Sequence, residues 1–273
     1  MMNKCFYIIT LLLIKISFFS QANNLGEHNG IEKTIDPFTN ISEYHILWKK
    51  QIIQRVDLNE KANKSFFAKN KEITKWIIQG IKNGDLQPYQ DNLCKKIMEK
   101  KEFENNLKLP EDNNIDDLNS LGNNNWDNTN NNLVKNHDYF LPNEISIMEI
   151  TSFVLFDIKE AKMKNIPYSI QFIIPSSKFA TGISRNLCVI KCEDFFKYTD
   201  KYPKDMIYFN NQNPAKHLTI REAFKINAYV SRIIKEENYN DDTIEDQFPD
   251  NPLHASINIE EKIIKKEESC WVY

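Results

Sequence analysis

Glycine is scarce in this sequence of 273 residues, and its placement excludes several kinds of catalytic and nucleotide-binding site. The chain has 6 glycines, and no two of them lie two or five positions apart. A Gly-x-Gly-x-x-Gly dinucleotide turn and a Gly-x-x-x-x-Gly-Lys phosphate loop are therefore absent. The sequence also contains no Gly-x-Ser-x-Gly nucleophile elbow. None of the 5 histidines precedes a glutamate, so there is no His-Glu-x-x-His zinc helix. We expect a protein that is not an enzyme, with no catalytic, cofactor-binding or metal-binding residues.

The sequence also lacks a concentrated run of basic residues. Lysine and arginine number 35 against 38 acidic residues, which gives a formal net charge of −3, and the two signs are mixed along most of the chain. A nucleic-acid-binding protein needs a dense positive surface, so no nucleic-acid partner is expected. The hydrophobic content of 41% is typical of a globular protein with one large domain or two small ones.

Long hydrophobic runs are missing except at the N-terminus. An apolar run from Cys5 to Phe19 follows Lys4, is interrupted by Lys15, and precedes small residues up to Ala22. The run is shorter than the roughly 20 residues of a spanning helix, which makes a permanent anchor the weaker alternative. Residues 1–22 are predicted to be a cleaved secretory signal peptide that exports the protein to the periplasm. Residues 23–40 are predicted to be a flexible lead-in.

Four cysteines remain after the predicted cleavage, at Cys94, Cys188, Cys192 and Cys270. In an exported protein they can form disulfide bridges. Cys188 and Cys192 lie about 13 Å apart if both belong to one strand, which is too far for a bridge or a shared metal ion. We interpret the cysteines as small buried apolar residues, with a redox state that the sequence leaves open.

Residues 41–104 are predicted to form an N-terminal helical part. A first helix is expected from Ser42 to Val56, because apolar residues recur at spacings of three and four. That apolar stripe consists of Ile41, Tyr44, Trp48 and Ile52. A second helix is expected from Lys71 to Asn83, with Gly84 as the left-handed residue that ends it. Between them, Asp57 to Lys61 is expected to be a capped turn with its charges in solvent.

Residues 105–136 are rich in asparagine and poor in large apolar residues, and they are predicted to be a disordered insert or linker. The C-terminal part, residues 137–273, begins with three β-rich runs at 145–158, 168–174 and 187–192. A long helix is expected to begin at Thr219, where Thr219 and Glu222 have the spacing of a capping box, and to reach Lys235 with Ile226, Val230 and Ile233 buried. A last amphipathic helix is expected from Ser256 to Cys270. The predicted fold class is α+β, with N-terminal helices, a small, mostly antiparallel sheet and C-terminal helices.

Three groups of residues invite a functional interpretation. Cys192 with His217 has the residue types of a nucleophile and its base, although no motif fixes their geometry. The acidic residues between Glu236 and Asp246 lack the alternating acids and central glycine of a calcium loop and are expected to form a solvated surface. The aromatic tail, Trp271 to Tyr273, has two alternatives: it anchors a partner, or it packs on its own domain.

Short motifs along the chain resemble the GldN/PorN family of gliding-motility and type IX secretion proteins. They run in the family's order from about Tyr44 to Tyr273. The matching stretches are Trp48-Lys49-Lys50 through Arg55, Asp57-Leu58-Asn59-Glu60-Lys61, Ile147-Met148-Glu149-Ile150, Cys192, Phe209-Asn210-Asn211-Gln212-Asn213, Ile234-Lys235-Glu236-Glu237-Asn238, Ile244-Glu245-Asp246 and Trp271. Each motif is weak alone, but their shared order over most of the chain is specific.

The resemblance implies a non-enzymatic subunit of a periplasmic ring at the inner face of the outer membrane. Its expected partners are a GldK/PorK-like outer-membrane lipoprotein, a GldM/PorM-like protein anchored in the inner membrane, and further copies of the same chain. The motif positions are then structural or interface residues: Trp48, Arg55, Asp57, Leu58, Glu60, Lys61, Met148, Glu149, Cys192, Asn213, Lys235, Glu236 and Trp271. The alternative functions are an exported enzyme that uses Cys192 and His217, and a soluble periplasmic binding module.

Overall fold

The computed structural model describes residues 35–110, 138–210 and 215–271 and divides the chain into two compact units, Met1–Ile46 and Leu47–Tyr273. The predicted signal peptide, most of the lead-in, residues 111–136 of the asparagine-rich segment and Asn213 lie outside the described residues. The described part of the first unit contains the short 3-10 helix η1 (Glu43–His45). Within the described ranges, no helix has the length and apolar character needed to span a membrane.

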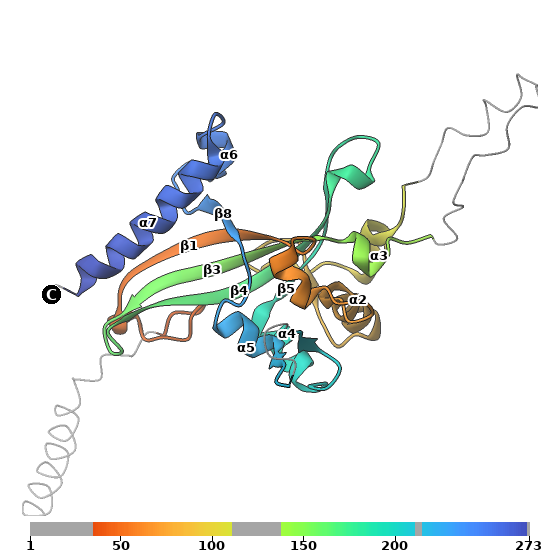
Figure 1. Ribbon diagram of the computed structural model, residues 1–273, viewed down its shortest axis with the longest axis horizontal. Coiled ribbons are helices and arrows are strands. Elements are labelled where there is room, and N and C mark those ends of the chain that lie inside the picture. Colours follow the sequence, from red (N-terminus) through yellow and green to blue (C-terminus); the bar gives the residue numbers. More distant parts are fainter. Residues whose placement is uncertain (1–34, 111–137, 211–214, 272–273) are drawn as a thin grey trace, which may run out of the picture. The chain divides into compact units, whose positions relative to one another are not determined.

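A six-stranded sheet forms the centre of the second unit (Figure 1). In spatial order its strands are β2 (Pro88–Tyr89), β5 (Arg185–Lys191), β4 (Lys162–Ile174), β3 (Ile147–Asp157), β1 (Ile46–Asp57) and β8 (Arg232–Glu236). The pairs β1–β8, β2–β5, β3–β4 and β4–β5 are antiparallel. Strands from both sides of the asparagine-rich segment therefore share one sheet, and the predicted α+β class with a mostly antiparallel sheet is confirmed.

The larger hydrophobic core lies between one face of this sheet and a group of helices. These are η2 (Lys61–Phe66), α2 (Ile73–Asn83), α3 (Lys100–Leu107), α4 (Cys192–Asp200) and α5 (Ile220–Lys225). The core contains buried phenylalanines at Phe66, Phe103, Phe172, Phe195 and Phe224. A separate two-stranded ribbon, β6 (Ile207–Tyr208) with β7 (Leu218–Thr219), precedes α5, and the remaining turns are η3 (Pro142–Glu144) and η4 (Ser176–Lys178).

A smaller core covers the other side of the sheet near β1 and β8. It is built with α6 (Ile244–Gln247) and α7 (Pro252–Cys270), and Figure 1 shows these two helices across the sheet from α2, α4 and α5. Its buried residues are Ile52, Val154, Ile233, Ile244, Ala255 and Ile259, against which Trp48 packs. Strand β3 is buried along nearly its whole length because the sheet is covered on both sides.

Several local predictions are confirmed. Helix α2 ends at Asn83, and Gly84 follows in the left-handed region with φ of 82°, which a residue with a side chain adopts at a cost. The three β-rich runs form β3, β4 and β5, and the last amphipathic segment forms α7. The placement of Cys192 in one strand with Cys188 is wrong, because β5 ends at Lys191 and Cys192 begins α4. The capping box is present, since the Thr219 side chain accepts from the Glu222 amide and Glu222 reaches back to the Thr219 amide.

The predicted first helix from Ser42 to Val56 is wrong, because residues 46–57 form strand β1. The stretch is rich in isoleucine and valine, whose branched side chains suit a pleated surface. Its pairing with β8 joins Ile52 to Glu236 and Arg55 to Arg232, which lie far away in the sequence. Trp48 packs against the smaller core as expected, but from a strand rather than a helix.

The long helix predicted from Thr219 to Lys235 is also wrong beyond its first turns. Helix α5 ends at Lys225, and Asn227 adopts a positive φ of 49°, which interrupts the helical path. Ile226 and Val230 are exposed instead of buried. Lys235 belongs to β8. Pairing with β1 supplies the backbone hydrogen bonds that a helix would have supplied.

The two ends of the asparagine-rich segment meet. Helix α3 continues to Leu107, past the predicted start of the segment at residue 105. The amide of Leu109 donates to Asp138 at 3.0 Å, and the amide of Phe140 donates to Leu107 at 2.9 Å. The segment therefore leaves and re-enters the second unit at one place.

Candidate interaction cleft

The turn after β1 builds one wall of a cleft. Asp57 ends the strand, and its Oδ1 accepts a hydrogen bond of 2.8 Å from the amide of Asn59, which bends the chain. Leu58 is fully buried in the larger core, and its amide donates to the carbonyl of Ser146 at 2.8 Å. Glu60 and Lys61 follow on the surface at the start of η2. The stretch thus combines two residues that fix the turn with two charges in solvent, as expected.

Asn63 connects this turn to the chain segment before β8. The residue is 0% exposed, and its Nδ2 donates to the carbonyls of Asp57 and Val230, both at 2.9 Å. Its Oδ1 accepts from the amide of Val230 at 2.9 Å. A buried amide in which both ends are paired holds two chain segments together at a fixed distance.

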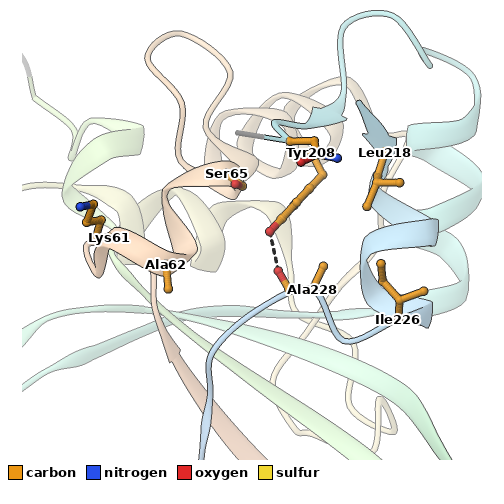
Figure 2. Close-up of a pocket in the computed structure, with 8 residues that line it drawn as sticks. Lys61, Ala62, Ser65, Tyr208, Leu218, Ile226 and Ala228 are labelled. Atoms are coloured by element: carbon orange, nitrogen blue, oxygen red, sulfur yellow. Dashed lines mark hydrogen bonds between the residues drawn. The ribbon is translucent and has the colours of Figure 1, made fainter. Parts of the chain in front are cut away.

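The opposite wall comes from the β6–β7 ribbon and the segment after α5. The hydroxyl of Tyr208 donates to the carbonyl of Ala228 at 2.6 Å, as Figure 2 shows. The amide of Phe209 donates to the carbonyl of Ser65 at 3.1 Å, which joins the ribbon to η2. Tyr208 also packs edge-on against Phe66, with ring centroids 4.8 Å apart. These contacts place the two walls against one hydrophobic base.

The cleft between the walls has a volume of about 670 Å³. It is lined by Lys61, Ala62, Ser65, Tyr208, Asn210, Leu218, Ile226 and Ala228. The lining residue Ile226 is 63% exposed. Among these described lining residues, the charged side chain is Lys61, so the cleft offers apolar contact, one cation and a few hydrogen-bonding groups. Such a surface suits the side chains of a protein partner.

The cleft brings together two of the stretches that carry the resemblance. Lys61 comes from the turn motif at 57–61, and Asn210 comes from the motif at 209–213. The amide of Asn210 donates to Nδ1 of His217 at 3.2 Å. The sequence did not predict that Leu218, Ile226 and Ala228 line the cleft. These residues become neighbours of η2 only when distant parts of the chain fold together.

Other motif residues stabilise the sheet. Nε and Nη2 of Arg55 on β1 donate to Oε1 of Glu149 on β3, at 2.9 and 2.7 Å. Only 9% of the Glu149 side chain is exposed, so the guanidinium compensates a nearly buried carboxylate. Met148, the preceding residue, is fully buried on the larger core. The motif combines an apolar residue with an acid because Met148 packs in the core and Glu149 pairs with Arg55.

The motif residues of β8 form ion pairs at the edge of the sheet. Lys235 binds Asp241 at 2.6 Å, and Glu236 binds Lys50 of β1 at 2.5 Å. Among the described residues there is no cluster of potential ligands for a metal ion. Trp271, after α7, is 61% exposed and packs edge-on against Phe156 with ring centroids 6.3 Å apart. It therefore contacts its own sheet and also leaves a broad face to solvent.

The geometry gives no support to a nucleophile at Cys192. The residue begins α4, is 1% exposed, and burial raises the pKa of its thiol well above the ordinary value. A protonated thiol is a poor nucleophile. His217 stacks on Phe209 with ring centroids 4.6 Å apart and accepts the Asn210 amide described above. The Cys192 side chain thus lies in the larger core, whereas the His217 ring contacts Phe209 and Asn210.

All four described cysteines have free thiols. Cys188, Cys192 and Cys270 are buried, as expected of small apolar residues. Cys94 is partly buried, and burial together with the nearby Asp91 raises the pKa of its thiol to about 12.

A comparison with known protein families shows the family of this chain. Residues 41–272 match the family described as gliding motility associated protein GldN. The chain belongs to the GldN family. The match begins just before β1 and ends after α7, so it includes the complete six-stranded sheet, the cleft and both hydrophobic cores of this GldN-family protein. No match was found among curated proteins.

Proposed function

We propose that this GldN-family protein is a non-enzymatic structural subunit of a periplasmic ring in a type IX secretion and gliding apparatus. It is exported with cleavage of residues 1–22 and assembles with a GldK/PorK-like outer-membrane lipoprotein, a GldM/PorM-like inner-membrane-anchored protein and further copies of itself. Family membership over residues 41–272 is the observation that supports this proposal most directly.

The surface of the second unit supports a role in protein contacts. The described cleft is built by the two motifs around Lys61 and Asn210 and holds the exposed Ile226 at its rim. Motif residues inside the fold, such as Arg55 and Glu149, fix the sheet that carries this surface. An apolar exposed patch on a rigid scaffold is typical of a surface that binds another protein.

A complementation experiment tests the proposal. The gene is deleted, and the strain is complemented with wild type, with Ile226→Asp in the cleft, or with Ile183→Asp as a matched control. Ile183 is 71% exposed and lies outside the cleft, so its variant makes the same chemical change at a remote site. Colony spreading, the amount of secreted protein and co-purification of the lipoprotein with the tagged chain are measured.

We expect the deletion strain to lose spreading and secretion, and Ile183→Asp to restore both. Ile226→Asp is expected to restore neither, while its circular dichroism spectrum and melting temperature match those of the control. If the deletion leaves spreading and secretion intact and the tagged chain retains no lipoprotein, the ring-subunit proposal is refuted.

A further inference from the structure

Helix α7 carries a second apolar stripe that faces away from the sheet. Leu253, Ile257 and Ile264 are 54, 47 and 59% exposed. Trp271, just past the end of the helix, falls on the same line and is 61% exposed, although one edge of its ring packs on Phe156 of β3. These residues are spaced by four, seven and seven positions. At about 100° per residue, all of them fall within about 40° of one line along the helix. Ala255, Ile259 and Cys270 occupy the buried side instead. We call the exposed line the α7 ridge.

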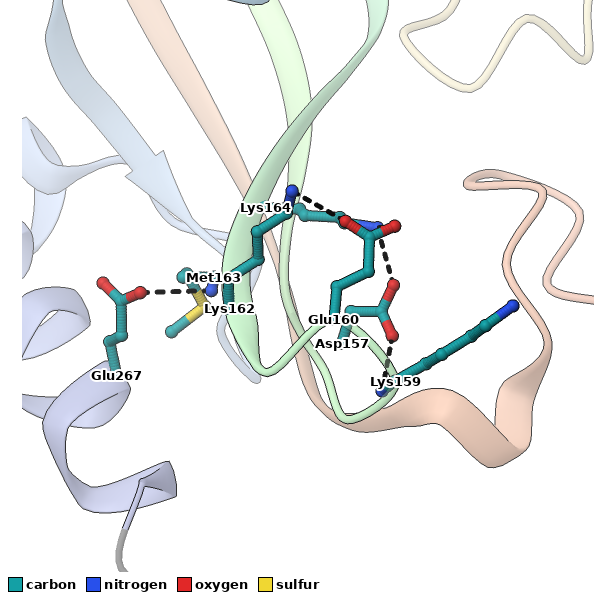
Figure 3. A network of polar contacts seen from close by, with 7 residues as sticks. All are labelled: Asp157, Lys159, Glu160, Lys162, Met163, Lys164 and Glu267. Carbon is teal, nitrogen blue, oxygen red and sulfur yellow. Dashed lines mark hydrogen bonds and ion pairs between the residues drawn. The ribbon is translucent and has the colours of Figure 1, made fainter.

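Glutamates flank the α7 ridge on both sides. By the same helical geometry, Glu260 and Glu267 lie along one flank and Glu261 and Glu268 along the other. Lys262 and Lys266 fall on the far side of the helix, whereas Lys265 lies next to Glu261 and pairs with it at 3.6 Å. Oε1 of Glu267 also accepts a hydrogen bond of 3.1 Å from the amide of Met163 on β4, which fixes the helix to the β3–β4 hairpin (Figure 3). The ridge is therefore an apolar surface with an acidic border, held rigidly on the sheet.

The cleft described above has the opposite charge around its apolar lining. Lys61 lines it, Lys225 precedes the exposed Ile226, and the carbonyl of Lys216 accepts a hydrogen bond of 3.3 Å from the Asn210 side chain. All three lysines are exposed. Of the nearby acids, Glu222 is engaged by the backbone and hydroxyl of Thr219, while Glu60 is exposed. The border of the cleft thus carries three lysines against two acids, a small excess of positive charge.

The position of the two surfaces determines how copies can pair. The ridge belongs to the helix that covers the smaller core, and the cleft belongs to elements that cover the larger core across the sheet (Figure 1). One copy cannot close the ridge into its own cleft, because the sheet separates them. Two ridges facing each other would oppose glutamate with glutamate, which disfavours a two-fold pair. A ridge bound in the cleft of a neighbour is a heterologous contact, and such contacts generate rings or filaments.

We propose that the α7 ridge of one copy docks in the Lys61–Ile226 cleft of the next copy, head to tail. The aliphatic side chains of the ridge fill the apolar lining, and its glutamates face the lysines at the border. This inference rests on the proposed ring function and deepens it by naming the two faces of the contact between copies.

Mixing two defective variants tests the head-to-tail geometry. The ridge variant is Ile257→Asp with Ile264→Asp, and the cleft variant is Ile226→Asp. Each is purified without residues 1–22, and mass is measured by light scattering over a range of concentrations. We expect wild type to form large assemblies and each variant alone to stay monomeric. The mixture should form a complex of twice the monomer mass, because one intact ridge meets one intact cleft.

Ile183→Asp serves as the control and is expected to assemble like wild type. If Ile226→Asp proves unfolded by circular dichroism, Lys61→Glu replaces it as the cleft variant. A mixture that stays monomeric, or a ridge variant that assembles like wild type, overturns the proposal. If wild type is monomeric alone and assembles only when the lipoprotein is added, the cleft or ridge is occupied by that protein, and the contact between copies is refuted. Such a result would leave the ring function supported, since lipoprotein binding and the deletion phenotype report on it separately.

Discussion

Asn63→Ala is expected to be strongly destabilising although the residue is a polar side chain outside the hydrophobic core. Asn63 is 0% exposed and makes hydrogen bonds of 2.9 Å with the Asp57 carbonyl and with both the carbonyl and the amide of Val230. Each bond contributes about 1 kcal/mol net, and its loss leaves a buried backbone group unpaired. The three bonds together predict a loss of about 3 kcal/mol in the free energy of unfolding.

Urea unfolding of the chain without residues 1–22, followed by tryptophan fluorescence, measures this loss. With an m-value of about 2–3 kcal/mol/M, the midpoint should fall by about 1 M. Asn59→Ala is the control, because Asn59 lies on the surface of the same turn and its side chain accepts a long, exposed hydrogen bond of 3.4 Å from Lys64. A loss below about 0.5 kcal/mol for Asn63→Ala, equal to the control, would refute the argument that Asn63 holds the two segments together.

Three further predictions concern the sheet and one helix end. Arg55→Ala should lower the free energy of unfolding by about 2 kcal/mol, because it leaves the nearly buried Glu149 carboxylate unpaired. Adding Glu149→Gln to this variant should recover part of the loss in the same urea assay. Burial acts to raise the pKa of Asp157, but the Lys164 ammonium group and backbone amides lower it below its ordinary value (Figure 3). The pair therefore stabilises the fold above the unfolded pKa of about 3.9, and this contribution disappears as the pH falls through the lower pKa of the folded state. The melting temperatures of wild type and Asp157→Asn should therefore converge on acidification. A difference in melting temperature that does not change with pH would contradict this assignment. Gly84→Ala should lower the free energy of unfolding by about 1 kcal/mol. The loss comes from the φ of 82° alone, because a Cβ at this position meets no atom within 4 Å. An unchanged melting temperature would show that the helix end relaxes.

Part of the candidate site was predictable from the sequence and part was not. The family resemblance points to both the turn at Asp57 to Lys61 and the motif at Phe209 to Asn213 as structural or interface stretches. Their meeting in one cleft was not predictable, because it depends on hydrogen bonds such as that from the Phe209 amide to the Ser65 carbonyl, across more than a hundred residues. Asn63 carried no signal, since buried and exposed asparagines look alike in a single sequence.

The sequence by itself determined the features whose causes are local. Gly84 ends α2, Thr219 and Glu222 cap α5, and the amphipathic pattern of α7 is visible over its length, because each depends on neighbours within a few residues along the chain. These features set the ends of helices, and they also placed the capping box correctly where the predicted length of the helix was wrong.

Tertiary structure decided the rest, above all the fate of residues 46–57 and 232–236. Both segments have spacings compatible with a helix, yet each supplies the other with hydrogen-bonding partners as β1 and β8. The free energy gained from that pairing and from burying Ile52 and Ile233 under α6 and α7 exceeds the small differences in local propensity. Pairing across about 180 residues has no signature in either segment alone, so only the folded sheet shows which conformation prevails.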